Sequence, residues 1–156
     1  MVTLELSKGQ YDQALIDHFE FLRNRFLNRG CTNPGLVIGS TSKKEVKIAN
    51  TFAFLKDGVW KSKSSAEVAF TATTHDIAAS ASNVREAVYL LTIAANGTVT
   101  ITKGTESSGA GTAKIPELPS DSAVVMGYVR VAVAAGATKF DATSDDLDAA
   151  HLTVTY

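Results

Sequence analysis

Apolar side chains near the start of the chain recur every three or four positions, which is the spacing of one face of an α-helix. Ser7 can cap the start of this helix, and Gly30 can end it. Acidic residues come early in the segment and arginines come late, which suits the helix dipole. The apolar stripe consists of Tyr11, Leu15, Phe19, Leu22 and Phe26, with Phe21 and Leu27 extending it sideways. The pattern predicts one N-terminal helix with a strongly apolar face.

After residue 35 the helical period gives way to alternation of apolar and polar residues, which is typical of β-strands. Residues 46–54 form one predicted strand, followed by a tight turn at 56–58 and a return strand that starts at 59–61. The side chains predicted on the buried face of the first strand are Val46, Ile48, Phe52 and Phe54. A further strand is predicted within residues 66–71.

The second half of the chain continues the strand pattern. Residues 87–93 are apolar at every position but one, so both faces of this strand are expected to be buried. Asn96-Gly97 predicts a type I′ hairpin turn into a strand at 98–102, and residues 103–120 predict a long, mobile surface loop. Two more strands follow at 123–133 and 152–156, the first with Val125, Val129, Val131 and Val133 on one face.

These roughly seven or eight short strands predict a mainly β protein, an antiparallel β-sandwich or barrel-like domain preceded by one α-helix. The predicted division is an N-terminal helical arm at residues 1–35 and a β domain at residues 36–156. A chain of 156 residues, 45% hydrophobic and 20% charged, can bury a core without disulfides or metals. Cys31 is the only cysteine, so no intrachain disulfide is possible.

Charge and hydropathy narrow the classes of partner. A formal net charge of -1 leaves no basic surface of the kind that binds nucleic acid. The first residues do not resemble a signal peptide, and the most apolar stretch, 124–137, is interrupted by Arg130 and is too short to cross a bilayer. We therefore expect a soluble protein made in a cytoplasm, without nucleic-acid or membrane partners.

The residues that carry catalysis and metal binding are scattered. His18, His75 and His151 have no second ligand at a metal-binding spacing, and Cys31 follows a helix C-terminus, where the dipole disfavours a thiolate. The acidic run Asp141, Asp145, Asp146 and Asp148 does not match the calcium-loop pattern. The pattern predicts no catalytic residue and no metal site. An enzyme assembled from His75, His151 and Asp145-Asp146 is the weaker alternative.

Two glycine-containing loops invite comparison with phosphate-binding loops. Residues 39–43 follow a short apolar run, but they lack the second glycine before the lysine and no helical pattern follows. Residues 104–109 have suitable glycines but no following Lys-Ser/Thr. No cofactor is therefore predicted.

The helix stripe and Trp60 are the candidate protein interface. Aromatic side chains in desolvated pockets usually dominate such interfaces. The helix can cover its apolar face either on the chain's own β domain or on other copies of the chain, because the spacing also fits a coiled coil. The sequence leaves both arrangements open. The candidate interface residues are Leu15, Phe19, Leu22, Phe26 and Trp60.

The β region is similar to small structural proteins of tailed bacteriophages, of the capsid decoration (cement) or head-fibre kind. The segments that carry the resemblance are 49–54 before Lys56-Asp57-Gly58, 70–76, the hairpin 89–101, 127–131 and 140–143. They carry no catalytic signature and lie within residues 46–156, so the N-terminal helix is outside the resemblance.

The resemblance implies a non-enzymatic virion protein that is displayed on the capsid surface after synthesis in the host cytoplasm. It implies a homotrimer and a major capsid protein as the partner, with many weak contacts acting together. A tail or baseplate appendage that contacts the host surface is the alternative. Exposed aromatic residues near loops 56–60 and 103–120 would favour that alternative.

Overall fold

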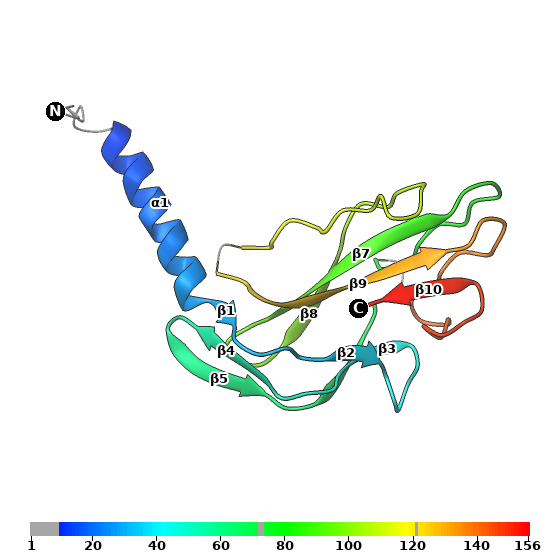
Figure 1. Ribbon diagram of the computed structural model, residues 1–156, viewed down its shortest axis with the longest axis horizontal. Coiled ribbons are helices and arrows are strands. Elements are labelled where there is room, and N and C mark those ends of the chain that lie inside the picture. The colour runs from blue at the N-terminus through cyan, green and yellow to red at the C-terminus, as the bar shows by residue number, and fades with distance from the viewer. Residues whose placement is uncertain (1–9, 72–73, 121) are drawn as a thin grey trace.

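The computed structural model describes residues 10–71, 74–120 and 122–156, and within them the protein is mainly β. Helix α1 (Gln10–Leu27) extends away from a body made of three antiparallel sheets (Figure 1). The predicted fold class, an antiparallel sandwich-like domain preceded by one helix, is confirmed.

The largest sheet has four strands and forms one layer of the body. Its order is β10 (Leu152–Thr155), β9 (Val124–Val133), β7 (Arg85–Ile93) and β8 (Val99–Lys103). Two three-stranded sheets lie against it. One has the order β1 (Arg29–Gly30), β4 (Phe52–Lys56) and β5 (Val59–Lys63), and the other has the order β2 (Leu36–Ile38), β3 (Glu45–Ile48) and β6 (Ala66–Ala69).

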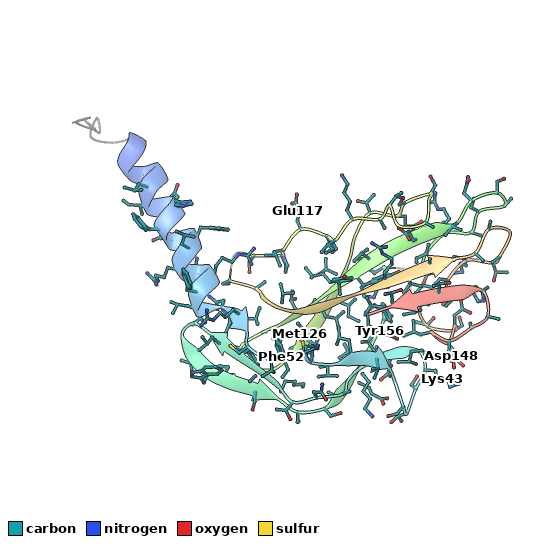
Figure 2. All side chains as sticks on the ribbon, in the orientation of Figure 1. Lys43, Phe52, Glu117, Met126, Asp148 and Tyr156 are labelled. Carbon is teal, nitrogen blue, oxygen red and sulfur yellow. The ribbon has the colours of Figure 1, made fainter. Side chains whose placement is uncertain are left out.

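The hydrophobic core lies between the four-stranded sheet and the two smaller sheets. Phe52 and Phe54 of β4 stack with their ring centroids 5.6 Å apart, and both belong to the same buried cluster as Val129 of β9. Phe52 and Met126 of β9 are both buried in this layer (Figure 2). As predicted for a central strand, β7 is buried along both faces from Glu86 to its end.

The single strand predicted at residues 46–54 is two strands in two different sheets. Val46 and Ile48 lie on β3, while Phe52 and Phe54 lie on β4, and all four side chains are buried on the predicted face. The chain changes sheets at residues 49–51, where Ala49 N and Asn50 N donate to the loop before β2. Because both strands face the same core, the alternation continues across the break and hides it.

The two hairpin turns differ in type, and the type I′ turn occurs at residues 57–58 rather than at residues 96–97. Asp57-Gly58 has φ values of 53° and 75°, the two positive values that a type I′ turn requires. At the β7–β8 hairpin only Gly97 has a positive φ, of 83°, while Asn96 does not. The bond from Ala94 N to Thr98 O closes a longer loop, so the predicted type I′ turn is wrong and the turn has the three-residue form with glycine last.

A β-bulge changes the first part of β9. Pairing with β7 shifts register just after Leu91, so one residue of β9 is extra. Val124 and Met126 are buried there and Val125 is exposed. The prediction that Val125 shares a face with Val129 is therefore wrong, because the extra residue reverses the alternation.

The end of the helix differs from the prediction. Helix α1 ends at Leu27 rather than just before Gly30, and the side-chain amide of Asn28 donates a hydrogen bond to Asn24 O of the last turn. Gly30 lies in β1, where a Cβ atom would lie 2.7 Å from the ring of Phe52, so glycine is needed for close packing. The predicted N-cap, Ser7, lies outside the described residues.

The boundary between the arm and the β body lies close to this helix end. Arg29 and Gly30 pair with Leu55 and Phe54 of β4, and Cys31 N donates to the next residue along β4. Residues 29–35, grouped with the arm from the sequence, are thus part of the β body, and the described part of the arm is α1 itself.

The long connection between β8 and β9 packs against the outer face of β7. The buried carboxylate of Glu86 accepts hydrogen bonds from Gly111 N at 2.9 Å and Ala113 N at 2.6 Å. Burial alone would raise the pKa of Glu86, but these N–H groups, together with the positive charge of Arg130 and the N–H of Thr112, outweigh it, and the pKa lies below its usual value. Residues 103–120 form the predicted surface connection, in which only Ala113 is buried, and the hydrogen bonds to Glu86 tie its middle to β7.

Candidate interaction surface

The apolar stripe of α1 is exposed. Phe19 and Phe26 leave 61% and 64% of their surface open, and Leu15 and Leu22 leave 45% and 37%. Within the part of the chain that the structure describes, no sheet lies beside the helix, whose side chains reach into open space (Figure 2). Packing of the stripe on the chain's own β body, one of the two arrangements left open by the sequence, does not occur in the described residues.

Two further apolar residues of α1, Ile16 and Phe21, lie on the two flanks of the stripe. Ile16 is 49% exposed and widens the stripe next to Phe19, from which it is separated by three positions; the stripe predicted from the sequence did not include it. Phe21 is 40% exposed and lies on the opposite flank of the stripe, about 100° around the helix from Leu22. The guanidinium of Arg25 lies 5.5 Å from the centre of the Phe21 ring, a cation–π contact on this flank of the helix.

Trp60, the remaining candidate interface residue, lies on β5 at the foot of the helix. It is 67% exposed and stands opposite Leu55 of β4, which in turn stands opposite Arg29 of β1. Directly opposed residues share one face of a sheet. The sheet therefore presents a short row of Arg29, Leu55 and Trp60 on its outer face.

Asn28 fastens the helix to the β body. Its side-chain oxygen accepts hydrogen bonds from Lys56 Nζ at 2.8 Å and Asp57 N at 3.0 Å, and its amide donates to Asn24 O at 2.9 Å. Gly58 N adds a bond to the last helical carbonyl. The direction of the helix is thus set by the β4–β5 turn. The sequence offered no signal for Asn28 beyond its place next to the helix end.

His75, a member of the alternative catalytic set, has a structural role. Its Nδ1 accepts a hydrogen bond from Thr71 N at 2.7 Å, so Nε2 carries the proton and donates to Ile101 O at 3.1 Å. The ring packs edge-on against Phe70 and Tyr89, and the Tyr89 hydroxyl donates to the His75 carbonyl. Burial lowers the pKa of His75, so the neutral form is the native one.

The acidic residues near the C-terminal end bond to backbone N–H groups of turns and to the side chains of lysines. The pKa of Asp141 is well below its usual range because the hydroxyl and N–H of Thr143 and the ammonium of Lys139 bond to it. Asp145 accepts from Asp141 N, and its carboxylate lies 3.7 Å from His151 Nε2. The structure thus brings two members of the alternative catalytic set, Asp145 and His151, within ion-pair distance.

Two further carboxylates of this region have assigned partners. Asp148 pairs with Lys43 at 2.6 Å, and both are labelled in Figure 2. Asp76 accepts from Ala142 N at 2.9 Å and pairs with Lys139 at 3.1 Å. Residues 10–71, 74–120 and 122–156 contain no group of three or more histidine, cysteine or acidic side chains placed to hold a metal ion. Cys31 is exposed.

The loop at residues 39–43 binds a carboxylate of the protein itself, that of Glu67. The backbone N–H groups of Ser40, Thr41 and Ser42 all donate to the Glu67 carboxylate, at 2.7 to 3.2 Å. The N–H of Thr41 and then the hydroxyl of Ser40 lower the pKa of Glu67 to about 2. The faint likeness to a phosphate loop therefore reflects real anion-binding geometry, filled by a side chain from β6.

No helix of the described residues has the length and hydropathy needed to cross a membrane. No protein-family model, curated protein or solved structure matches this chain.

Proposed function

We propose that this protein is a non-enzymatic structural protein of a virion, a capsid decoration (cement) protein that binds and stabilises neighbouring major capsid subunits as a homotrimer. The observation that carries the proposal is the unpartnered aromatic stripe of α1, which stands away from a compact β body on a fixed base. Support for the capsid as the partner comes from the resemblance of the β region to phage decoration proteins.

The stripe offers enough apolar surface for a specific contact between copies. With a fully exposed large side chain at about 200 Å², the exposed parts of the five side chains amount to about 500 Å². A stable interface buries roughly 800 Å² on each partner, so the helix supplies more than half before any contact from the β body is added. These side chains are Leu15, Ile16, Phe19, Leu22 and Phe26.

A helix of 18 residues needs such a partner. Isolated helices of this length are marginally stable in water, because nucleation is unfavourable and few hydrogen bonds follow. Three parallel copies would bury the stripe of each helix against the other two. Their β bodies would then share one end of the bundle, since Asn28 fixes each body to its helix.

The most direct test is immunogold labelling of intact virus particles, combined with binding of the purified protein to expanded empty capsids. We expect label over the whole head and saturable binding to capsids, with none on particles that have lost their heads. Label absent from every particle, together with no capsid binding, would overturn the proposal.

A tail or baseplate appendage that contacts the host surface is a second candidate, and one observation favours it. Trp60 and Val59 next to the β4–β5 turn are 67% and 57% exposed, and exposed rings of this kind stack on sugars. In the labelling experiment this role would give gold at the tail alone. Trp60→Ala would then reduce attachment to host cells without changing the oligomeric state.

A further inference from the structure

The two sheets β2-β3-β6 and β10-β9-β7-β8 leave an open slot between strands β6 and β8. The slot has a volume of about 410 Å³ and is lined by residues 66–69 of the β6 side and residues 96–99 of the β8 side, with Lys63 at one end. β6 and β8 are each the last strand of their sheet. The slot is therefore bounded by two strand edges.

On β6, the backbone groups that face the slot belong to Glu67 and Ala69. Residues of an antiparallel strand direct their N–H and C=O groups alternately to opposite sides. Glu45 of β3 bonds toward β2, so its neighbour Val46 bonds toward β6, where it pairs with Val68. The alternate residues Glu67 and Ala69 consequently direct their backbone groups away from β3, into the slot.

On β8, the corresponding residues are Val99 and Ile101. Thr98 O accepts a hydrogen bond from Ala94 N, which places Thr98 and every second residue after it on the β7 side. Val99 and Ile101 therefore face outward. Among the described residues, the outward N–H and C=O groups of Glu67, Ala69 and Val99 have no hydrogen-bond partner.

His75 shows how wide the slot is, because it closes one end of it. The alternation that continues from Glu67 and Ala69 makes Thr71 N an outward group, and this N–H bonds to one nitrogen of His75 at 2.7 Å. The other nitrogen bonds to the outward carbonyl of Ile101 at 3.1 Å. One imidazole ring with two hydrogen bonds thus bridges the two edges.

This width is the width of one strand. Strands in a sheet lie about 4.8 Å apart and stacked sheets about 10 Å apart, so two stacked edges leave room for a single strand that bonds to both. The floor of the slot suits such a strand, since Ala66, Val68 and Val99 are partly buried against the core. A strand placed there would cover them with every second side chain.

We propose that this slot, here called the lateral slot, binds an extended peptide segment of a partner protein by β-strand addition. The segment forms main-chain hydrogen bonds with Glu67 and Ala69 on one side and with Val99 on the other. Its inward side chains are small and apolar, and its outward side chains are polar. An acidic residue at the end near Lys63 adds charge complementarity. The inference does not depend on the virion role, because it rests only on the two strand edges.

The test uses NMR of the full ¹⁵N-labelled chain with a capped heptapeptide of alternating threonine and valine that ends in glutamate. A generic sequence suffices because main-chain bonds supply most of the affinity in strand addition. We expect saturable shifts and slowed amide exchange at Glu67, Ala69 and Val99. A peptide N-methylated at every second amide should bind at least about tenfold more weakly, since each lost bond is worth roughly 1 kcal/mol.

A variant pair places the same change inside and outside the slot. Ala69→Pro removes one outward N–H, and proline is tolerated on an edge strand, so binding should weaken while the protein stays folded. Ser62→Pro on the edge strand β5 is the matched control and should bind as the wild type does.

Three results would overturn the proposal. The first is no shift at millimolar peptide, and the second is shifts confined to the helix stripe. The third is binding at the slot that N-methylation leaves unchanged. The N-methylated peptide keeps the test decisive if Ala69→Pro does not fold, because it requires no change in the protein.

Discussion

Replacing Phe19 and Phe26 with alanine should dissociate the proposed trimer, and the structure gives the scale of the effect. The two side chains are 61% and 64% exposed. With an aromatic side chain at about 200 Å², each leaves about 120 Å² open. At about 25 cal/mol for each Å² buried, covering one of them stabilises the assembly by about 3 kcal/mol.

The predicted loss for the double variant follows from this value. Alanine keeps a methyl group, so each replacement forfeits about 2 kcal/mol per chain at full burial. Six replacements in a trimer give an upper bound of about 12 kcal/mol. If half of the surface is buried, about 6 kcal/mol remains, which raises the dissociation constant of the trimer by about 10⁴-fold.

Sedimentation equilibrium over a wide range of concentrations measures this change. The matched control is Phe21→Ala, which removes a phenylalanine from the flank of the same helix, about 120° away from the centre of the stripe, where Arg25 contacts its ring. Because the stripe does not touch the β body, the urea midpoint of the monomeric β body should stay unchanged in all variants. A double variant that remains trimeric at the wild-type concentration would refute the role of the stripe, and so would a wild-type chain that is monomeric at high concentration.

Three other predictions concern the β body. Glu86→Gln should lower the free energy of unfolding by about 2 kcal/mol, measured by urea denaturation, because a buried N–H of Ala113 loses a charged acceptor. An unchanged urea midpoint would show that the Glu86 carboxylate does not hold the loop in place. Since the pKa of His75 is lowered from 6.5 in the folded state, stability should fall as pH drops below 6.5. Urea midpoints measured at pH 7.5 and 5.5 test this. If the midpoint of His75→Gln falls by the same amount as that of the wild type, a group other than His75 causes the loss of stability. Glu67→Ala empties the anion site around Thr41, so sulfate should raise the melting temperature of the variant more than that of the wild type at equal ionic strength; equal shifts would argue against it.

Much of the fold follows from the alternation in the sequence because burial repeats every second residue in every strand. The central strand β7 was recognisable from its continuous apolar run, and β6 and β10 from their short alternating segments. The change of sheet at residues 49–51 was not recognisable, since Val46 and Phe52 face one core from two sheets. Side-chain periodicity reports the direction of a residue relative to the core and not the sheet to which its backbone bonds.

The features of the fold that the sequence did not predict depend on contacts between residues far apart in the chain. The bulge near Met126 depends on how β9 pairs with β7, and the fixed middle of the loop after β8 depends on Glu86, a residue far earlier in the chain. A glutamate inside a strand reads as a solvent-facing residue by composition alone. Only the fold shows that two N–H groups from the loop meet its carboxylate.

The apolar stripe of the candidate interface could be predicted from the sequence, but its exposure could not. Spacings of three and four identify the stripe of α1, because they depend only on helix geometry. Its exposure depends instead on where the helix points, and that direction is fixed by Asn28 and the turn at Lys56 and Asp57. These contacts join residues that are almost thirty positions apart, so no local pattern announces them.

The two unpartnered surfaces differ in chemistry, and this difference makes their proposed roles separable. The stripe of α1 presents side-chain area without free backbone groups, so any partner must bind by apolar contact and shape. The lateral slot presents unpaired backbone groups of Glu67, Ala69 and Val99 above a small apolar floor, so its partner must be an extended chain. A helix stripe is indifferent to main-chain N-methylation of a ligand, and a strand edge is indifferent to Phe19 and Phe26. A protein that joins copies of itself through one surface can therefore bind a different partner through the other at the same time.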